Sequence, residues 1–193
     1  MVTQLTKKAY TVDEYLDLEV ASESRSEYRN GEIIPMTGGT PNHNEIAVNL
    51  LAVIKPALRG KPHRLFSVDQ RLWIPDVKMY TYPDVMVALK PLEMQMGRKD
   101  TITNPCFIAE VLSKSTQNYD CSEKFAAYRT VDTFQEYFLI DQYRVHVEHH
   151  VKTATNQWLF SEYNDPSVAI TLQFLDLQIQ IADLYDNIDF DQI

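Results

Sequence analysis

Two apolar, strand-like segments each carry one acidic residue, and this pairing constrains the fold more than any other feature of the chain. Residues 80–89 read YTYPDVMVAL and residues 106–112 read CFIAEVL, so Asp84 and Glu110 each interrupt an apolar run. An unpaired carboxylate is costly to bury, because the apolar interior does not replace its hydration. We therefore expect both strands to lie in one sheet and to bring the two carboxylates to a shared cleft.

Helical periodicity is present at three other places. Thr11 can cap a short helix over residues 12–18 through a capping box. Asn42 precedes a longer apolar-periodic run and can cap a buried helix that ends before Gly60. Residues 122–131 have helical spacing and follow the second acidic strand, so we expect a short helix beside that strand.

The remaining segments are typical of β-structure. Asn30-Gly31 suits the positive φ angles of a hairpin turn, residues 64–75 and 136–141 have the composition of strands, and the last 50 residues read as a β-rich meander. This order predicts an α/β (α+β) fold with a mixed β-sheet core flanked by helices and with additional β-hairpins. With 193 residues and no linker-like tract, we expect a single domain over residues 1–193.

Composition excludes several classes of protein. No apolar run is long enough to cross a bilayer and no signal peptide is recognisable, so we expect a cytoplasmic protein without membrane contact. Cys106 and Cys121 lack the spacing of a zinc site and are expected to be reduced thiols. The formal net charge of −9 argues against a surface that binds DNA all over, although a local basic cleft is compatible with it.

The acidic pair points to a divalent metal. Carboxylate oxygens are hard ligands that suit Mg²⁺, with Mn²⁺ as the alternative, and Mg²⁺ commonly takes one or two carboxylates together with phosphate oxygens. Phosphoryl chemistry at such an ion also needs a nearby ammonium to stabilise negative charge. Two lysines are candidates, Lys114 in the loop after the strand and Lys124 on the next helix, and we favour Lys124 because Leu112 occupies the same-strand position.

An ordered set of segments carries a family resemblance. In chain order they are EYRNGEIIPM, His43 at the start of a helix, YPDVMV, FIAEVLSKST, and then Asp120, Lys124, Tyr128 and EYFLID. Together they resemble a large restriction endonuclease family that is expanded in cyanobacteria and assigned to the PD-(D/E)XK nuclease superfamily. The resemblance implies a restriction-endonuclease-like fold in which Asp84 and Glu110 bind the metal. It also implies that the catalytic lysine has moved from position 112 to Lys124.

Other polar residues are more simply interpreted as structural. Glu32 is expected on the exposed face of the first hairpin, and His43 is expected either to cap its helix or to bind a phosphate. The run His146-Val147-Glu148-His149-His150 suggests a transition-metal site, but strand alternation predicts that His146, Glu148 and His150 form an ordinary exposed face.

Two functional hypotheses follow, beside a less favoured third in which the acidic strands are structural and the β-rich tail mainly mediates assembly. The first is a Mg²⁺-dependent endonuclease that hydrolyses DNA phosphodiester bonds with Asp84, Glu110 and Lys124 as catalytic residues. The alternative is a nuclease-fold module that binds nucleic acid or protein with weak or no catalysis, since fold alone does not prove function. A homodimer is expected in the first case, because cutting both strands of a duplex requires two sites.

Overall fold

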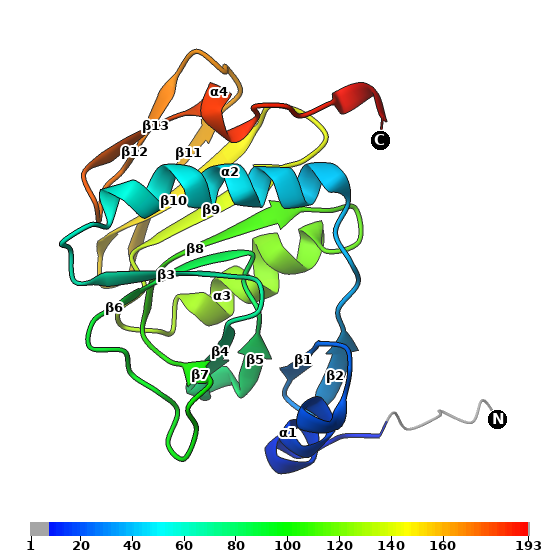
Figure 1. Ribbon diagram of the computed structural model, residues 1–193. Helices are drawn as coiled ribbons and strands as arrows, with labels where there is room; N and C mark the ends of the chain where they lie inside the picture. Colours follow the sequence, from blue (N-terminus) through cyan, green and yellow to red (C-terminus); the bar gives the residue numbers. More distant parts are fainter. Residues whose placement is uncertain (1–7, 193) are drawn as a thin grey trace.

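A six-stranded mixed sheet forms the centre of the molecule in a computed structural model that describes residues 8–192 (Figure 1). Its strand order is β11-β10-β9-β8-β6-β3, with β8 and β9 parallel and every other pair antiparallel. All eight residues of β8 are buried, as expected for a central strand covered on both faces. The strands are β3 (His63–Ser67), β6 (Val85–Leu89), β8 (Pro105–Leu112), β9 (Glu136–Asp141), β10 (Val147–Ala154) and β11 (Gln157–Tyr163).

A second sheet, of order β2-β1-β5-β4-β7, is built from the first hairpin and later short strands. The predicted hairpin is confirmed, since Asn30 and Gly31 have φ of 43° and 101°. Helix α1 (Val12–Ala21) has the predicted Thr11 capping box and covers this sheet through a cluster of tyrosines. The strands are β1 (Ser26–Arg29), β2 (Glu32–Pro35), β4 (Arg71–Ile74), β5 (Met79–Thr81) and β7 (Thr101–Ile102).

Helix α2 (Pro41–Ala57) crosses one face of the central sheet (Figure 1) and buries one stripe of its surface there. Ile46, Leu50 and Ile54 are fully buried against the sheet, and each such side chain contributes about 1.5–3 kcal/mol. The helix begins earlier than the sequence predicts, because Thr40 rather than Asn42 is its cap: the Thr40 hydroxyl accepts the amide of the third helical residue. The Asn42 side chain instead donates to a C-terminal carbonyl.

The opposite face of the sheet is covered by the segment that follows β8. A wide π-helical turn, η2 (Tyr119–Lys124), runs directly into α3 (Phe125–Tyr128). The predicted short helix therefore exists, but its first turn is wider than an α-helix, a distortion often found at functional sites. On the α2 side, the sheet is also covered by a small hairpin and a short helix: β12 (Ala169–Leu172), β13 (Leu177–Gln180) and α4 (Ile181–Leu184). The remaining elements are two short 3-10 turns, η1 (Pro75–Val77) and η3 (Phe190–Gln192).

Two predicted continuous strands are each divided between the two sheets. The segment 64–75 turns between β3 and β4, and the segment 80–89 leaves the second sheet after Thr81 and enters the central sheet at Val85. Pro83 lacks an amide hydrogen and favours a break in strand pairing, so Asp84 lies where the chain passes between sheets. This crossing brings residues of the first hairpin next to the central sheet. Within residues 8–192, no helix has both the length and the apolarity to span a bilayer.

Candidate active site

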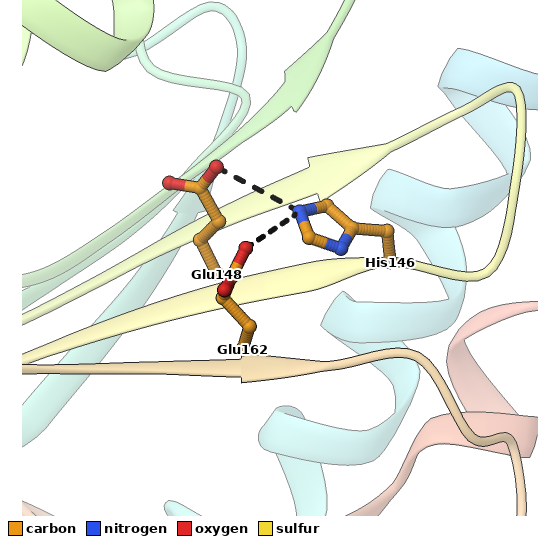
Figure 2. Close-up of side chains that lie close together, drawn as sticks. All are labelled: His146, Glu148 and Glu162. Carbon is orange, nitrogen blue, oxygen red and sulfur yellow. Dashed lines mark ion pairs between the residues drawn. The ribbon is translucent and has the colours of Figure 1, made fainter.

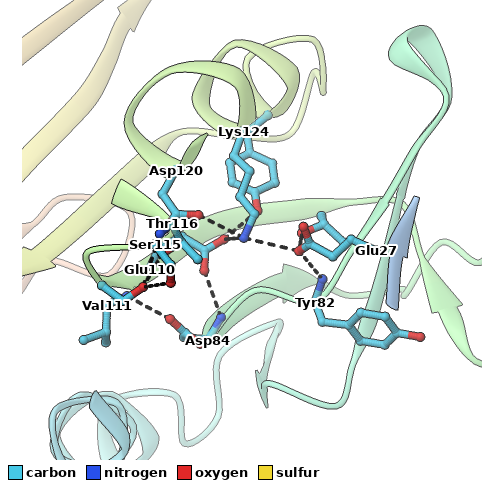
Figure 3. Close-up of polar contacts among 12 residues, drawn as sticks. Glu27, Tyr82, Asp84, Glu110, Val111, Ser115, Thr116, Asp120 and Lys124 are labelled. Atoms are coloured by element: carbon cyan, nitrogen blue, oxygen red, sulfur yellow. Dashed lines mark hydrogen bonds and ion pairs between the residues drawn. The ribbon is translucent and has the colours of Figure 1, made fainter. Parts of the chain in front are cut away.

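The two predicted carboxylates meet at the edge of a cavity of about 800 Å³ that opens beside the start of α2. Asp84 immediately precedes β6 and Glu110 lies in β8, and the antiparallel register of these strands pairs Val85 with Ala109. The neighbouring positions, 84 and 110, are therefore brought together by strand pairing. Figure 3 shows Asp84 and Lys124 each joined to Glu110 by a polar contact.

Asp84 is oriented by contacts from two different elements. Its Oδ2 accepts the amide hydrogen of Val111 at 2.8 Å, and the same oxygen lies 3.2 Å from Nε2 of His43 on α2. The Asp84 amide in turn donates to Oε2 of Glu110 at 3.3 Å. The β6–β8 pair thus ties the two acidic residues to each other through main-chain groups.

The ring of His43 does not cap its helix, and its binding of a phosphate stays a prediction. Its side chain is 17% exposed and points at Asp84 instead of capping the helix through its ring. Burial lowers the pKa of His43, but hydrogen bonding to Asp84 and the charge of that carboxylate outweigh burial and raise it overall. The raised pKa favours the protonated ring, which forms an ion pair with the Asp84 carboxylate.

Lys124 lies among carboxylates in the interior of the site. Its Nζ is 3.2 Å from Oε1 of Glu110, 3.3 Å from Oε1 of Glu27 and 3.1 Å from Oδ1 of Asp120. Burial alone would lower the pKa of Lys124, but these carboxylates, Glu110 foremost, hold it well above its ordinary value. The ammonium therefore stays charged at neutral pH. The Tyr128 hydroxyl, one turn further along, donates to the same Glu110 oxygen at 2.7 Å.

Glu27 and Asp120 belong to the site although neither is a sequence-predicted site residue. Glu27 comes from β1 in the second sheet, where it is 5% exposed and accepts the amide of Tyr82 and the hydroxyl of Thr81. No local pattern marks Glu27, because its approach depends on how the two sheets meet. Asp120 was identifiable by its spacing, four residues before Lys124, in a segment that the family resemblance already included.

The donor set fits a hard divalent cation. Three carboxylates, those of Glu27, Glu110 and Asp120, contact the Lys124 ammonium, and Asp84 lies beside Glu110. Acidic side chains therefore outnumber basic ones in the cluster, even when His43 is counted. Burial raises the pKa of Glu110 to about 8; Lys124 opposes this shift, and Asp84 and Asp120 add to it. A bound cation would offset the cost of burying this charge, so it would lower the pKa of Glu110 and favour the ionised carboxylate.

The other lysine candidate lies at the rim of the cavity. Lys114 is exposed, its amide donates to the Tyr143 hydroxyl at 3.3 Å, and its ammonium lies 4.8 Å from the centre of the Tyr143 ring. Leu112, at the usual lysine position, is 3% exposed in the core. Glu32 lies outside the acidic cluster and pairs with Arg29 at 3.0 Å, and it is half-buried where the sequence predicted an exposed position.

The prediction that His146, Glu148 and His150 form an exposed face is wrong. His146 is 6% exposed, and Glu148 and His150 are half-buried. Alternation along β10 is as predicted, but the face opposite Val147 and Val151 is covered: His150 packs against Phe125 at 4.5 Å and Phe160 at 5.0 Å between ring centres. Aromatic side chains thus cover the face that the strand pattern predicts to be exposed to solvent.

Comparisons with known proteins agree with this architecture. The Uma2 family model, described as "Putative restriction endonuclease", matches residues 12–183. Two uncharacterized proteins of Synechocystis sp. are similar over nearly their whole length. The protein sll1609 is 38% identical over 175 residues, which cover 91% of this chain and 99% of the relative. The protein slr1290 is 32% identical over 180 residues, which cover 92% of each chain. These matches confirm the family resemblance.

A solved structure confirms the predicted fold class. It is described as "a putative nuclease belonging to DUF820 from Anabaena variabilis" and superposes with a TM-score of 0.74. The superposition covers 92% of this chain and 98% of that chain at 21% sequence identity. At this identity the two chains share a fold, and the likeness carries no further statement about the site.

Proposed function

The chain belongs to the Uma2 family, described as putative restriction endonucleases, and from this membership we propose that it is a Mg²⁺-dependent endonuclease that hydrolyses phosphodiester bonds in DNA. The observation that carries the proposal is the buried acidic cluster beside an open cavity. In it the Lys124 ammonium lies 3.2 Å from Glu110, and Asp84 and Glu110 are tied together by strand pairing. Mn²⁺ would fit the same oxygen ligands.

The side chains have separate roles in this proposal. Asp84 and Glu110 would hold the cation, with His43 and the Val111 amide orienting Asp84. When bound, such a cation polarises a phosphoryl oxygen and lowers the pKa of water. Lys124 remains protonated among its carboxylates, so it serves to stabilise negative charge developing on the phosphate and not to remove a proton.

Replacing Asp84 by Asn tests the metal ligand. The change keeps the size of the side chain and an oxygen that can accept the Val111 amide, but it removes the charge that would attract the cation. Since the residues that orient a metal ligand each account for about 10–100-fold in activity, loss of the ligand should reduce cleavage at least about 100-fold. Digestion of total genomic DNA with MgCl₂ is the assay, with circular dichroism as the control for folding. Undiminished cleavage by D84N would remove Asp84 from the mechanism.

A matched pair of lysine variants separates the two candidates. K124M leaves buried carboxylates without their ammonium, which should abolish cleavage and, without metal, destabilise the fold by about 3–5 kcal/mol. K114M makes the same chemical change at an exposed lysine and should leave both cleavage and stability near wild type. The opposite result, an inactive K114M and an active K124M, would transfer the role to Lys114. If wild type binds DNA without cutting it, the binding-module alternative replaces the nuclease.

A further inference from the structure

A second group of candidate metal ligands lies on the hairpin formed by β10 and β11, in the residues that the sequence pattern places on an exposed face. His146 precedes β10, Glu148 is within β10 and Glu162 is within β11. One ligand atom from each residue lies within 4.8 Å of the other two. Figure 2 shows the three side chains converging above the hairpin. None of them lines the candidate active-site cavity.

Strand register holds two negative charges directly opposite each other. Glu148 and Glu162 are Cα partners in the antiparallel β10–β11 ladder, so their side chains leave the same face of the sheet. Like charges in this position destabilise a sheet. His146 is two residues before Glu148 and lies on that face too, with Nε2 at 3.7 Å from Glu148 Oε1 and 3.9 Å from Glu162 Oε1. The backbone therefore sets three ligand atoms around one point.

The ring of His146 is held by a hydrogen-bond partner on the nitrogen that faces away from the two glutamates, as is common for histidine ligands of metals. Its ring is nine-tenths buried, and Nδ1 lies 2.6 Å from Oδ1 of Asn164. Because an amide oxygen can only accept, this contact places a hydrogen on Nδ1, and Nε2 is the ring nitrogen that faces the two glutamates. The distances from Nε2 to both carboxylates exceed those of a hydrogen bond. A histidine that binds a metal through one ring nitrogen typically donates the hydrogen of the other to such an outer partner.

A second histidine borders the cluster. Nε2 of His150 is buried and has no hydrogen-bond partner among the described residues, and it lies 3.5 Å from Oε2 of Glu148. Glu148 thus has one oxygen toward each histidine. The contact of Nε2 with Glu148 is longer than a normal hydrogen bond, so this nitrogen is a further polar group beside the cluster that lacks a close partner.

We propose that His146, Glu148 and Glu162 bind one divalent transition-metal ion of the Zn²⁺ class, independently of the proposed nuclease centre. Two ligands of a tetrahedral Zn²⁺, each about 2.0–2.1 Å from the ion, lie roughly 3.4 Å apart, so separations of 3.7 and 3.9 Å require only small rotamer adjustments. One imidazole with two carboxylates favours Zn²⁺ over Mg²⁺, which prefers oxygen alone. The half-exposed Glu162 gives the ion access and leaves a position for water.

The ion would cross-link chain segments at one edge of the central sheet. It would join β10, β11 and the turn that enters β10 at His146. That turn includes Gln142 and Tyr143, which line the candidate active-site cavity. The expected consequence is a hairpin that resists opening when the ion is bound, since any ligand of the native state stabilises that state by mass action.

Zinc titration of the metal-free full-length chain tests the site. Isothermal titration with ZnCl₂ should show that E162Q binds one equivalent fewer than wild type, or binds that equivalent at least about 100-fold more weakly. E162Q is expected to fold because Glu162 is half-exposed. E45Q is the matched control, with the same loss of charge at an exposed glutamate on α2, and it should titrate as wild type does. D84N/E110Q should keep the equivalent that E162Q loses.

Nuclear magnetic resonance of the histidine rings gives a second readout. One equivalent of Zn²⁺ added to D84N/E110Q should shift the Nε2 resonance of His146 and leave Nδ1 protonated. The proposal is overturned if E162Q and E45Q bind Zn²⁺ equally. It is also overturned if His146 is doubly protonated and its resonances do not respond to Zn²⁺, because the histidine then serves only as a cation between two glutamates. Neither result would affect the D84N test of the nuclease.

Discussion

The Glu110 carboxylate is placed between opposing influences. It is 2% exposed, close to the negative charge of Asp84 and Asp120, yet it receives the Lys124 ammonium and the Tyr128 hydroxyl on one oxygen. Burial has the largest effect and raises the pKa of Glu110 from 4.5 to about 8. Because its pKa is raised by burial, the Glu110 carboxyl couples metal binding and protonation to the folding of the chain.

The stability of the metal-free protein should therefore fall as the pH rises through the interval from about 4.5 to 8. In this interval the folded chain retains a proton on Glu110 that the unfolded chain has lost, so raising the pH favours unfolding, by at most about 1.4 kcal/mol per pH unit for one group. Urea unfolding in EDTA at pH 5.5, 6.5 and 7.5 measures the slope. E110Q should lose this contribution, and parallel slopes for E110Q and wild type would refute it. Excess Mg²⁺ should restore stability at the alkaline end.

The loop between β2 and α2 holds the histidine that orients Asp84. Gly38 and Gly39 lie side by side in this loop, but they differ in their surroundings. A Cβ atom at Gly39 would lie 2.8 Å from Nδ1 of His43 and 2.8 Å from Oδ1 of Asn44, whereas one at Gly38 would meet nothing within 4 Å. The absence of a side chain at Gly39 thus lets the start of α2 bring His43 to the acidic pair.

G39A should displace the His43 ring from Asp84, and G38A is its matched control. Because Asp84 is the main group that raises the pKa of His43, that pKa should fall in G39A and stay at the wild-type value in G38A. Proton resonance titration of the ring measures it directly. We also expect about a 10-fold loss of DNA cleavage in G39A, the lower end of the effect of removing an outer partner of a metal ligand. Identical titration curves for the two variants would argue against this role of Gly39.

The charge of the chain as a whole opposes its proposed substrate. There are 18 basic and 27 acidic residues, giving a formal net charge of −9, and the cavity itself contains the acidic cluster. A phosphate approaching this cavity meets like charge unless a divalent cation is already bound. We therefore expect the proposed cation to be required for binding DNA as well as for the proposed cleavage.

DNA binding should accordingly depend on a divalent cation. Fluorescence anisotropy of a labelled duplex at constant ionic strength should show at least about 10-fold tighter binding with CaCl₂ than with EDTA, since Ca²⁺ offers the same hard charge to oxygen ligands. D84N/E110Q should show no such gain, and E162Q should behave as wild type. Equal binding by wild type in EDTA and in CaCl₂ would contradict the prediction.

The homodimer stays a prediction. Cleavage of both strands of a duplex at one place calls for two copies of the site, and cyclic dimers are the commonest way to supply them. Light scattering of the purified chain with and without duplex DNA measures its mass in each condition. A monomer in both conditions, together with double-strand cleavage, would rule out the dimer as the cutting species.

Local sequence is sufficient to predict the elements whose signals are short-range. The Asn30-Gly31 turn, the Thr11 capping box and the apolar stripe of α2 depend on neighbours within a few residues, and each is present as predicted. The breaks inside residues 64–75 and 80–89 are not predicted, because composition reports burial and extended backbone but not which sheet a strand joins.

The acidic pair and its lysine are recognisable from the amino-acid sequence alone, since a charged residue inside an apolar strand requires a physical explanation. The order of residues is enough to put Asp84 and Glu110 on neighbouring strands and Lys124 on the helix that follows. It does not show that Glu27 from the other sheet completes the cluster, or that aromatic side chains cover the face carrying His146; both depend on tertiary packing. These contacts join residues that are far apart along the chain, and no local sequence pattern indicates them. They form only when the two sheets and their covering helices pack together.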